Sequence, residues 1–162
     1  MNMALVIQML VLLAIANGTP VIIKRLFGAR ADWEIDGGMR LADGRFVFGP
    51  SKTIRGTVSS VIATALIAAA VGLTLYAGVV VALGAMAGDL ASSFIKRRLG
   101  LEPSSKATGL DQIPEALLPC LLLLTILPLT AGDIAVIVLI FFGGEIIFSK
   151  VLFRAGVRDR PY

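Results

Sequence analysis

Residues Gly56–Ile95 read GTVSSVIATALIAAAVGLTLYAGVVVALGAMAGDLASSFI. These 40 residues contain one charged side chain, Asp89. At a rise of about 1.5 Å per residue, a helix of this length would measure about 60 Å, which is twice the hydrocarbon thickness of a bilayer. The stretch therefore predicts two membrane-spanning helices, residues 57–75 and 79–95, joined by a tight turn near Tyr76-Ala77-Gly78.

A second apolar stretch, Met1–Ile23, carries no charge and predicts one span over residues 3–23. It has neither the basic n-region nor the small-residue cleavage site of a signal peptide, so we expect it to be retained. A third stretch, Ala116–Ser149, contains only two acidic residues and predicts the spans 115–130 and 134–150, with a turn at 131–133. The two arms of this hairpin are short for a bilayer crossing.

The composition agrees with a membrane protein. Of the 162 residues, 57% are hydrophobic and 16% charged, and the mean hydropathy is +0.89. Soluble domains are nearer half apolar and a quarter charged. We therefore predict an all-α membrane protein, with five spans in a single domain covering residues 1–162.

The basic residues test this topology. With five spans, the segments 24–55, 96–115 and 150–162 face the same side of the membrane, and they hold all fifteen Lys and Arg residues. The positive-inside rule makes that side cytoplasmic, so the N-terminus lies outside and the C-terminus inside. We expect a multi-pass protein of the cell membrane whose functional groups face the cytoplasm.

The residues that are missing exclude several chemistries. The chain has no His, which removes imidazole acid–base catalysis and imidazole metal ligands. A lone cysteine, Cys120, excludes an intrachain disulfide and a cysteine-ligated zinc or iron–sulfur centre. Any catalysis must use carboxylates, Lys, Arg, hydroxyls and the backbone.

The first cytoplasmic segment, residues 24–55, predicts a short β-hairpin around Asp43-Gly44, because Asp-Gly pairs favour turns. Its run Gly49–Thr53 is not a phosphate-binding P-loop, since Ser51 stands directly before Lys52 where that motif needs Gly. A weaker interpretation is an anion cradle at a helix start. Alternatively, its cations only anchor the next span at the lipid headgroups, which is common in membrane proteins.

Asp89 is the most informative single residue. It lies seven residues before Lys96, about 10 Å deeper in the membrane, and shares one helix face with Ser92, Ser93 and Lys96. A carboxylate at that depth is a functional-site hypothesis by default. The alternative is a buried acid satisfied by a neighbouring helix, beside a small-residue packing seam made of Gly84, Gly88 and Ser92. That seam would also suit a homodimer.

The second cytoplasmic segment holds Lys96-Arg97-Arg98 and Asp111. Asp111 could be the N-cap of the fourth helix or a second carboxylate returning toward Asp89. Two carboxylates beside a basic cluster suit magnesium-assisted phosphoryl chemistry, in which metal and cations neutralise phosphate oxygens. Glu145 could complete a polar cavity or pair with a loop cation, and Asn17 with Pro20 could line a cavity or kink the first helix.

Four ordered motifs resemble the CDP-archaeol synthase family, which is related to the CDP-diglyceride synthetases. They are Asp36-x-Gly38; Phe48-Gly49-x-Ser51-Lys52-Thr53-x-Arg55-Gly56; Gly88-Asp89-Leu90-x-x-Ser93-Phe94-Ile95-Lys96-Arg97-Arg98; and Gly109-Leu110-Asp111-Gln112. The longer diglyceride synthetase signature continues to a His-Gly-Gly that this chain lacks, and the short Leu110-Asp111-Gln112 form points to the archaeol branch.

This resemblance implies a reaction of CTP with a phosphorylated glycerolipid, giving CDP-lipid (CDP-archaeol or CDP-diacylglycerol) and pyrophosphate with Mg²⁺. It implies that Asp89 and Asp111 bind the metal and that Lys96 acts with them in catalysis. The substrate-binding residues that it implies are Asp36, Ser51, Lys52, Thr53, Arg55, Ser93 and Arg97. No nucleic-acid partner is expected.

Two other classes of function are alternatives. A small transporter would use Asp89 and Glu145 as an intramembrane relay and would need polar groups across the bilayer depth. A non-catalytic membrane subunit would explain the topology but would leave the ordered motifs unexplained.

Overall fold

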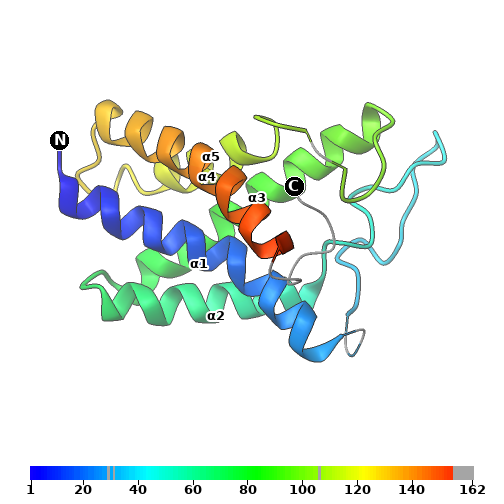
Figure 1. Cartoon of the computed structure of the whole chain (residues 1–162), viewed down its shortest axis with the longest axis horizontal. Helices are drawn as coiled ribbons and strands as arrows, with labels where there is room; N and C mark the ends of the chain where they lie inside the picture. The colour runs from blue at the N-terminus through cyan, green and yellow to red at the C-terminus, as the bar shows by residue number, and fades with distance from the viewer. Residues whose placement is uncertain (29, 31, 106, 155–162) are drawn as a thin grey trace.

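The computed structural model describes residues 1–28, 30, 32–105 and 107–154 (Figure 1). Lys106, Arg158 and Arg160, which belong to the charge count above, lie outside the described residues. Within the described part the chain forms five helices and no strands longer than isolated bridges. The helices are α1 (Met3–Phe27), α2 (Ile54–Ala70), α3 (Leu75–Arg98), α4 (Gln112–Leu122) and α5 (Ala131–Arg154). The all-helical prediction is confirmed.

The helices differ in their ability to cross a membrane. Three of them, α1, α3 and α5, are long and apolar enough to do so. The helices α2 and α4 are apolar but shorter, with 17 and 11 residues. At about 1.5 Å per residue, α4 is about 16 Å long, half the thickness of a bilayer core. A membrane protein is therefore supported, while the count of five spans stays a prediction.

Both predicted turns in the apolar hairpins are displaced. The chain reverses at 71–74, and Thr74 caps α3 by accepting a hydrogen bond from the backbone N–H of Ala77. The predicted turn at 131–133 is the first turn of α5 instead. The reason is a capping box, in which the Thr130 hydroxyl accepts from the Asp133 N–H and the Asp133 carboxylate accepts from the Thr130 N–H.

The fourth helix also ends earlier than the predicted 115–130. It stops at Leu122, and residues 123–127 continue as turns. Pro128 has no N–H to donate and its ring clashes with the carbonyl four residues earlier in a helix, which disfavours extension of the helix to residue 130.

The two long connecting segments gather at one end of the bundle. Figure 1 shows residues 32–53 and 99–105 at the same end, on the right, whereas the N-terminus and the connections 71–74 and 123–130 lie at the other. The described parts of the first two basic segments therefore lie at one end of the bundle, while the side of the membrane that they face stays a prediction. At the opposite end of the bundle, the Asp133 carboxylate also accepts from the backbone N–H of Asn2 at 2.9 Å.

Small residues form the seam between α3 and α4. A Cβ placed on Gly88 would lie 2.4 Å from the carbonyl oxygen of Pro114, and one on Gly84 would lie 2.9 Å from the Cα of Pro119. The two glycines therefore allow α4 to approach α3 within one chain. Of the two roles considered for this seam, the structure shows intramolecular packing, and a homodimer draws no support from it.

Large apolar side chains cover the outside of the bundle while several polar ones are inside. Exposed side chains include Ile62, Leu66, Leu139 and Ile147, whereas Ser60, Thr64 and Asp133 are fully buried. An apolar exterior of this extent is typical of a surface that contacts lipid or another protein.

The first connecting segment folds back on itself around Asp43-Gly44. A single antiparallel bridge joins Arg40 to Phe46, and hydrogen bonds run from Leu41 N to Arg45 O and from Val47 N to Met39 O. The turn is where the sequence predicts it, but the arms pair too briefly to count as strands.

Candidate functional site

A polar cavity of about 660 Å³ lies at the end of the bundle where the two long segments meet. Its volume is within the range of roughly 300–1,000 Å³ that small-molecule sites occupy. All of α1, α3, α4 and α5 contribute to its wall, together with both connecting segments. The residues used below are Asn17, Pro20, Lys24, Ser51, Lys52, Thr53, Asp89, Ser93, Lys96, Arg97, Ser105, Asp111, Gln112, Glu115, Glu145 and Lys150.

The cavity contains an ion pair between the first segment and α3. The Lys52 ammonium lies 2.6 and 2.5 Å from the two carboxylate oxygens of Asp89, and both side chains are about four-fifths buried. The acid that the sequence singles out thus has a specific partner 37 residues away. Asp89 thus has a charged partner and lines the cavity, while its functional role stays a prediction.

Lys52 is held in place by backbone pairing as well. The N–H of Ile35 donates to the carbonyl of Lys52 at 2.8 Å, and the N–H of Ile54 donates to the carbonyl of Trp33 at 2.9 Å. Thr53 then caps α2 by accepting from the backbone N–H of Gly56 at 3.2 Å. Burial alone would lower the pKa of Lys52, but the surrounding carboxylates, Asp89 foremost, outweigh it and raise the pKa above its ordinary value. Lys52 therefore stays charged.

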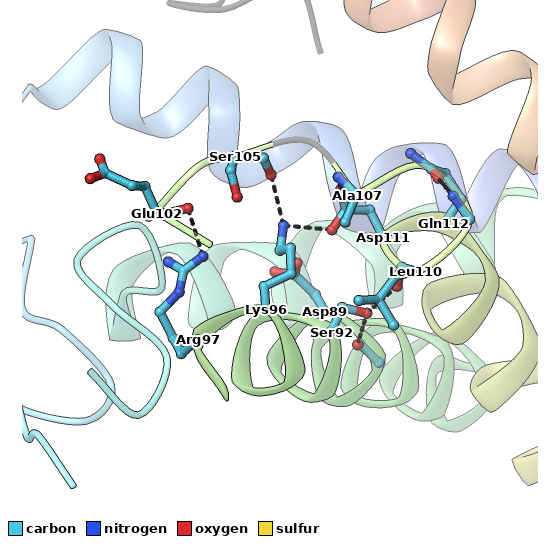
Figure 2. A network of polar contacts seen from close by, with 12 residues as sticks. Asp89, Ser92, Lys96, Arg97, Glu102, Ser105, Ala107, Leu110, Asp111 and Gln112 are labelled. Carbon is cyan, nitrogen blue, oxygen red and sulfur yellow. Dashed lines mark hydrogen bonds and ion pairs between the residues drawn. The ribbon is translucent and has the colours of Figure 1, made fainter. Parts of the chain in front are cut away.

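A second ion pair joins α3 to the start of α4. The Lys96 ammonium lies 2.5 Å from a carboxylate oxygen of Asp111, and it also donates to the carbonyl of Ser105 at 3.1 Å (Figure 2). Asp111 precedes α4 but makes no side-chain capping bond, and it accepts from the N–H of Ala107 at 2.9 Å instead. Of the two roles considered for Asp111, the structure supports the carboxylate that returns to the cavity.

The four polar residues predicted to share one face of α3 do not all line the cavity. Asp89, Ser93 and Lys96 line the cavity. Ser92 does not, because its hydroxyl reaches the carbonyls of Gly88 and Leu110 and so ties α3 to the segment before α4. Arg97 also lines the cavity and is 3% exposed, with its guanidinium donating to the carbonyl of Glu102 at 2.6 Å.

Two of the predicted substrate-binding residues lie outside the cavity wall. Arg55 donates to the carbonyls of Gly28 and Arg30 and pairs with Asp32 at 2.9 Å, so it holds the end of α1 against the start of α2. Asp36 accepts from the N–H groups of Gly38, Phe48 and Gly49. In the structure these two residues organise the first segment, and Ser51, Lys52 and Thr53 are the members of the motif at the cavity.

The backbone environment of Asp36 has an electrostatic consequence. Partial burial would raise the pKa of its carboxyl group, but the three N–H donors, Phe48 first, lower the pKa below the ordinary 3.8. The ionised carboxylate therefore stabilises the turn immediately before Gly49, where the Gly49–Thr53 run begins.

Arg98 connects the hairpin to α3. Its guanidinium lies 2.8 Å from the Asp43 carboxylate and donates to the carbonyl of Phe46, while Arg45 donates in return to the carbonyl of Arg98 at 2.6 Å. Arg45 thereby satisfies a free carbonyl at the C-terminus of α3. Of the three adjacent cations, two face the cavity and Arg98 is structural.

Several cavity residues were not singled out from the sequence. Glu115 lies on α4 one turn after Asp111 and is 7% exposed, and the helical spacing of four from Asp111 is the signal that could have revealed it. Gln112 accepts from the N–H of Gly109 and lines the cavity. Lys24 and Lys150 reach the wall from α1 and α5. Asn17, Pro20 and Glu145 line it as well.

The donor set suits a metal that is shared with a substrate. No group of three or more Cys, Asp or Glu side chains in the described part of the chain is arranged to hold an ion alone. Mg²⁺ does not require one, since it usually binds to one or two carboxylates, waters and substrate phosphates. Asp89 and Asp111 supply two carboxylates at one cavity, so these residues fit a Mg²⁺ ion that is shared with a substrate.

A comparison with protein families identifies the chain's relatives. The model of the CarS-like family, described as CDP-archaeol synthase, matches residues 2–162. This chain belongs to that family. A CDP-archaeol synthase of Hyperthermus butylicus is 47% identical over 104 residues, covering 60% of this chain and 59% of the relative. One of Thermofilum pendens is 29% identical over 156 residues, covering 91% of this chain and 76% of the relative.

A solved structure supports the fold. It is described as an intramembrane enzyme for archaeal membrane lipid biosynthesis, and it superposes with a TM-score of 0.60 at 30% identity. The match covers 84% of this chain and 92% of that one. The chain spans about half to three-fifths of the length of the first curated relatives, 59% of the one from Hyperthermus butylicus and 49% of a CDP-archaeol synthase of Methanopyrus kandleri.

Proposed function

We propose that this protein is a CTP-dependent cytidylyltransferase that transfers CMP to the phosphate of an archaeol-type lipid, giving CDP-archaeol and pyrophosphate. The observation that carries the proposal is the pair of ion pairs, Lys52–Asp89 and Lys96–Asp111, at one cavity of a CDP-archaeol synthase family member. Two carboxylates and two ammonium groups at one cavity support a site for two phosphorylated substrates.

The reaction needs no nucleophile from the protein. A phosphate oxygen of the lipid attacks the α-phosphorus of CTP, a new P–O bond forms, and the bond to the β-phosphate oxygen breaks as pyrophosphate leaves. Catalysis then rests on positioning and charge neutralisation. In this cavity Lys52, Lys96 and Arg97 supply the positive charge, and Ser51, Thr53 and Ser93 supply hydroxyl groups.

Asp89 and Asp111 would hold Mg²⁺, which neutralises phosphate charge when bound. Each carboxylate is already oriented by a lysine, because Lys52 bonds both oxygens of Asp89 and Lys96 bonds Asp111. This pre-orientation is a feature of the chain's own residues. It lowers the cost of fixing the acids when substrate arrives.

The position of the cavity suits two substrates from different phases. It lies at the end of the bundle that gathers the basic segments, where the positive-inside rule places the cytoplasm. A nucleotide would enter from water and a lipid phosphate from the adjoining bilayer. The transporter alternative gains no support, because Asp89 and Glu145 line this same cavity instead of marking a path across the membrane.

The test uses protein purified in detergent and supplied with CTP, Mg²⁺ and either archaetidic acid or phosphatidic acid. We expect pyrophosphate release and CDP-lipid formation, with loss of both in Asp89→Asn. Asp43→Asn is the matched control, since it neutralises an exposed acid outside the cavity. Absence of pyrophosphate with every lipid phosphate, or full activity in Asp89→Asn, would refute the proposal. The two lipids distinguish CDP-archaeol from CDP-diacylglycerol formation.

A further inference from the structure

Two polar atoms in the cavity wall are buried without a partner. The Nε of Arg97 and the hydroxyl oxygen of Ser105 are inaccessible to solvent, and neither makes a hydrogen bond with another described residue. The large majority of buried side-chain polar atoms in folded proteins are paired, because an unpaired one costs about 1–3 kcal/mol. Two such groups in the same wall therefore call for an explanation, and a ligand that accepts from both is one.

The segment that carries Ser105 is folded closely over the end of α3. Figure 2 shows Lys96 and Arg97 rising from α3 toward the segment with Glu102 and Ser105. The segment is held there by Arg97, which bonds the carbonyl of Glu102, and by Lys96, which bonds the carbonyl of Ser105. Ser104 between them has φ of 59°, a left-handed conformation that is uncommon outside glycine.

The chemistry of these groups selects an anion. Arg97 can only donate hydrogen bonds, and Ser105 can donate one through its hydroxyl group. The Lys96 ammonium group is nearby, since it donates to the backbone carbonyl of Ser105. Arg97 also packs against the first segment, since its Nη1 would lie 3.6 Å from a Cβ on Gly49. A group with several acceptor oxygens, bound in the cavity beside Arg97 and Ser105, would offer an acceptor to each of the two unpaired atoms.

We propose that Ser105 is a substrate-binding residue, and that its hydroxyl and the Arg97 Nε together bind a phosphate group. This inference rests on the proposed function, because it assigns a subsite within the same cavity. The phosphate belongs either to the nucleotide or to the lipid, which share this chemistry. The segment 102–105 thus closes one side of the site and contributes a donor that the motifs do not contain.

The experiment compares Ser105→Ala, Ser105→Thr and Ser59→Ala in steady-state kinetics with CTP and archaetidic acid varied separately. Loss of a hydrogen bond to a charged group is expected to raise KM for one substrate about tenfold or more. Ser105→Thr keeps the hydroxyl and should restore most of the affinity. Ser59→Ala is the matched control, because its hydroxyl bonds only its own helix and lies outside the cavity. A rise for CTP assigns the nucleotide phosphate and a rise for archaetidic acid the lipid phosphate.

A binding measurement separates this inference from the proposed function. Inorganic pyrophosphate, added to protein without lipid, should raise the thermal unfolding temperature more in the wild type and Ser105→Thr than in Ser105→Ala. Archaetidic acid added without nucleotide is the second arm. Unchanged KM values for both substrates, together with equal thermal shifts in all variants, would overturn the assignment of Ser105. A wild type that releases no pyrophosphate but binds phosphate through Ser105 would refute only the proposed reaction.

Discussion

Replacing Gly88 by Ala tests whether the approach of α4 to α3 positions the site. The added Cβ would lie 2.4 Å from the carbonyl oxygen of Pro114 and 2.7 Å from the N of Glu115, against an ordinary contact distance of 3.4 Å. These are backbone atoms, so α4 must move by about 1 Å to relieve the contact. Overpacking of this kind costs about 1–3 kcal/mol of unfolding free energy.

The same displacement should reach the cavity. Glu115 is on α4, Asp111 directly precedes the first residue of α4, and both line the cavity. A misplacement of about 1 Å at catalytic groups can reduce a rate about 100-fold. We therefore expect Gly88→Ala to lower the rate of pyrophosphate release about 100-fold, also at temperatures where the variant is fully folded. Gly84→Ala should have a smaller effect, because its Cβ would meet Pro119 at 2.9 Å.

The assay is pyrophosphate release together with thermal unfolding in detergent, and Gly143→Ala is the matched control. Gly143 is also a helical glycine, but an added Cβ there meets nothing within 4 Å. The gain in helix propensity from Gly to Ala, about 1 kcal/mol, is thus common to all three variants. If Gly88→Ala matched Gly143→Ala in both rate and unfolding temperature, the inferred role of the seam would be wrong.

Three further predictions concern the scaffold. The carboxyl group of Asp36 has a lower pKa in the folded than in the unfolded protein, so the stability that it contributes is present above pH 3.8 and is lost as the pH falls through the lowered pKa. The unfolding free energies of wild type and Asp36→Asn should therefore converge in acid. A difference in unfolding free energy that stays constant with pH would contradict this. Thr130→Ala removes the capping bond to Asp133 and should lower the unfolding free energy by about 1 kcal/mol, with pyrophosphate release unchanged at temperatures where the protein is folded; a loss of activity there would count against it. Arg98→Ala should expose the hairpin to limited proteolysis more than Asp43→Ala, because Arg98 also bonds two hairpin carbonyls; equal cleavage rates would argue against this connection.

Much of the site could be predicted because its residues follow local rules. The spacing of Asp89, Ser93 and Lys96 is a property of one helix, so their common face requires no knowledge of the rest of the chain. The same spacing placed Ser92 on that face, yet its hydroxyl bonds toward Leu110, because α4 and its preceding segment pack on that edge of α3. The spacing along a helix predicts the side of the helix on which a residue lies, whereas its hydrogen-bond partner depends on which segment packs against that side.

The sequence by itself determined the apolar helices, the gathering of basic segments at one end and the residue types available for chemistry, because hydrophobic length and charge act segment by segment. Only the tertiary structure decided which partner each charged group has. Lys52 pairs with Asp89 and Lys96 with Asp111, while Arg55, Asp36 and Arg98 hold the scaffold. Ion pairing depends on distances of a few ångströms between segments that are far apart in the sequence. Those distances are set by the close packing of α4 on Gly88 and by the folding of the two connecting segments.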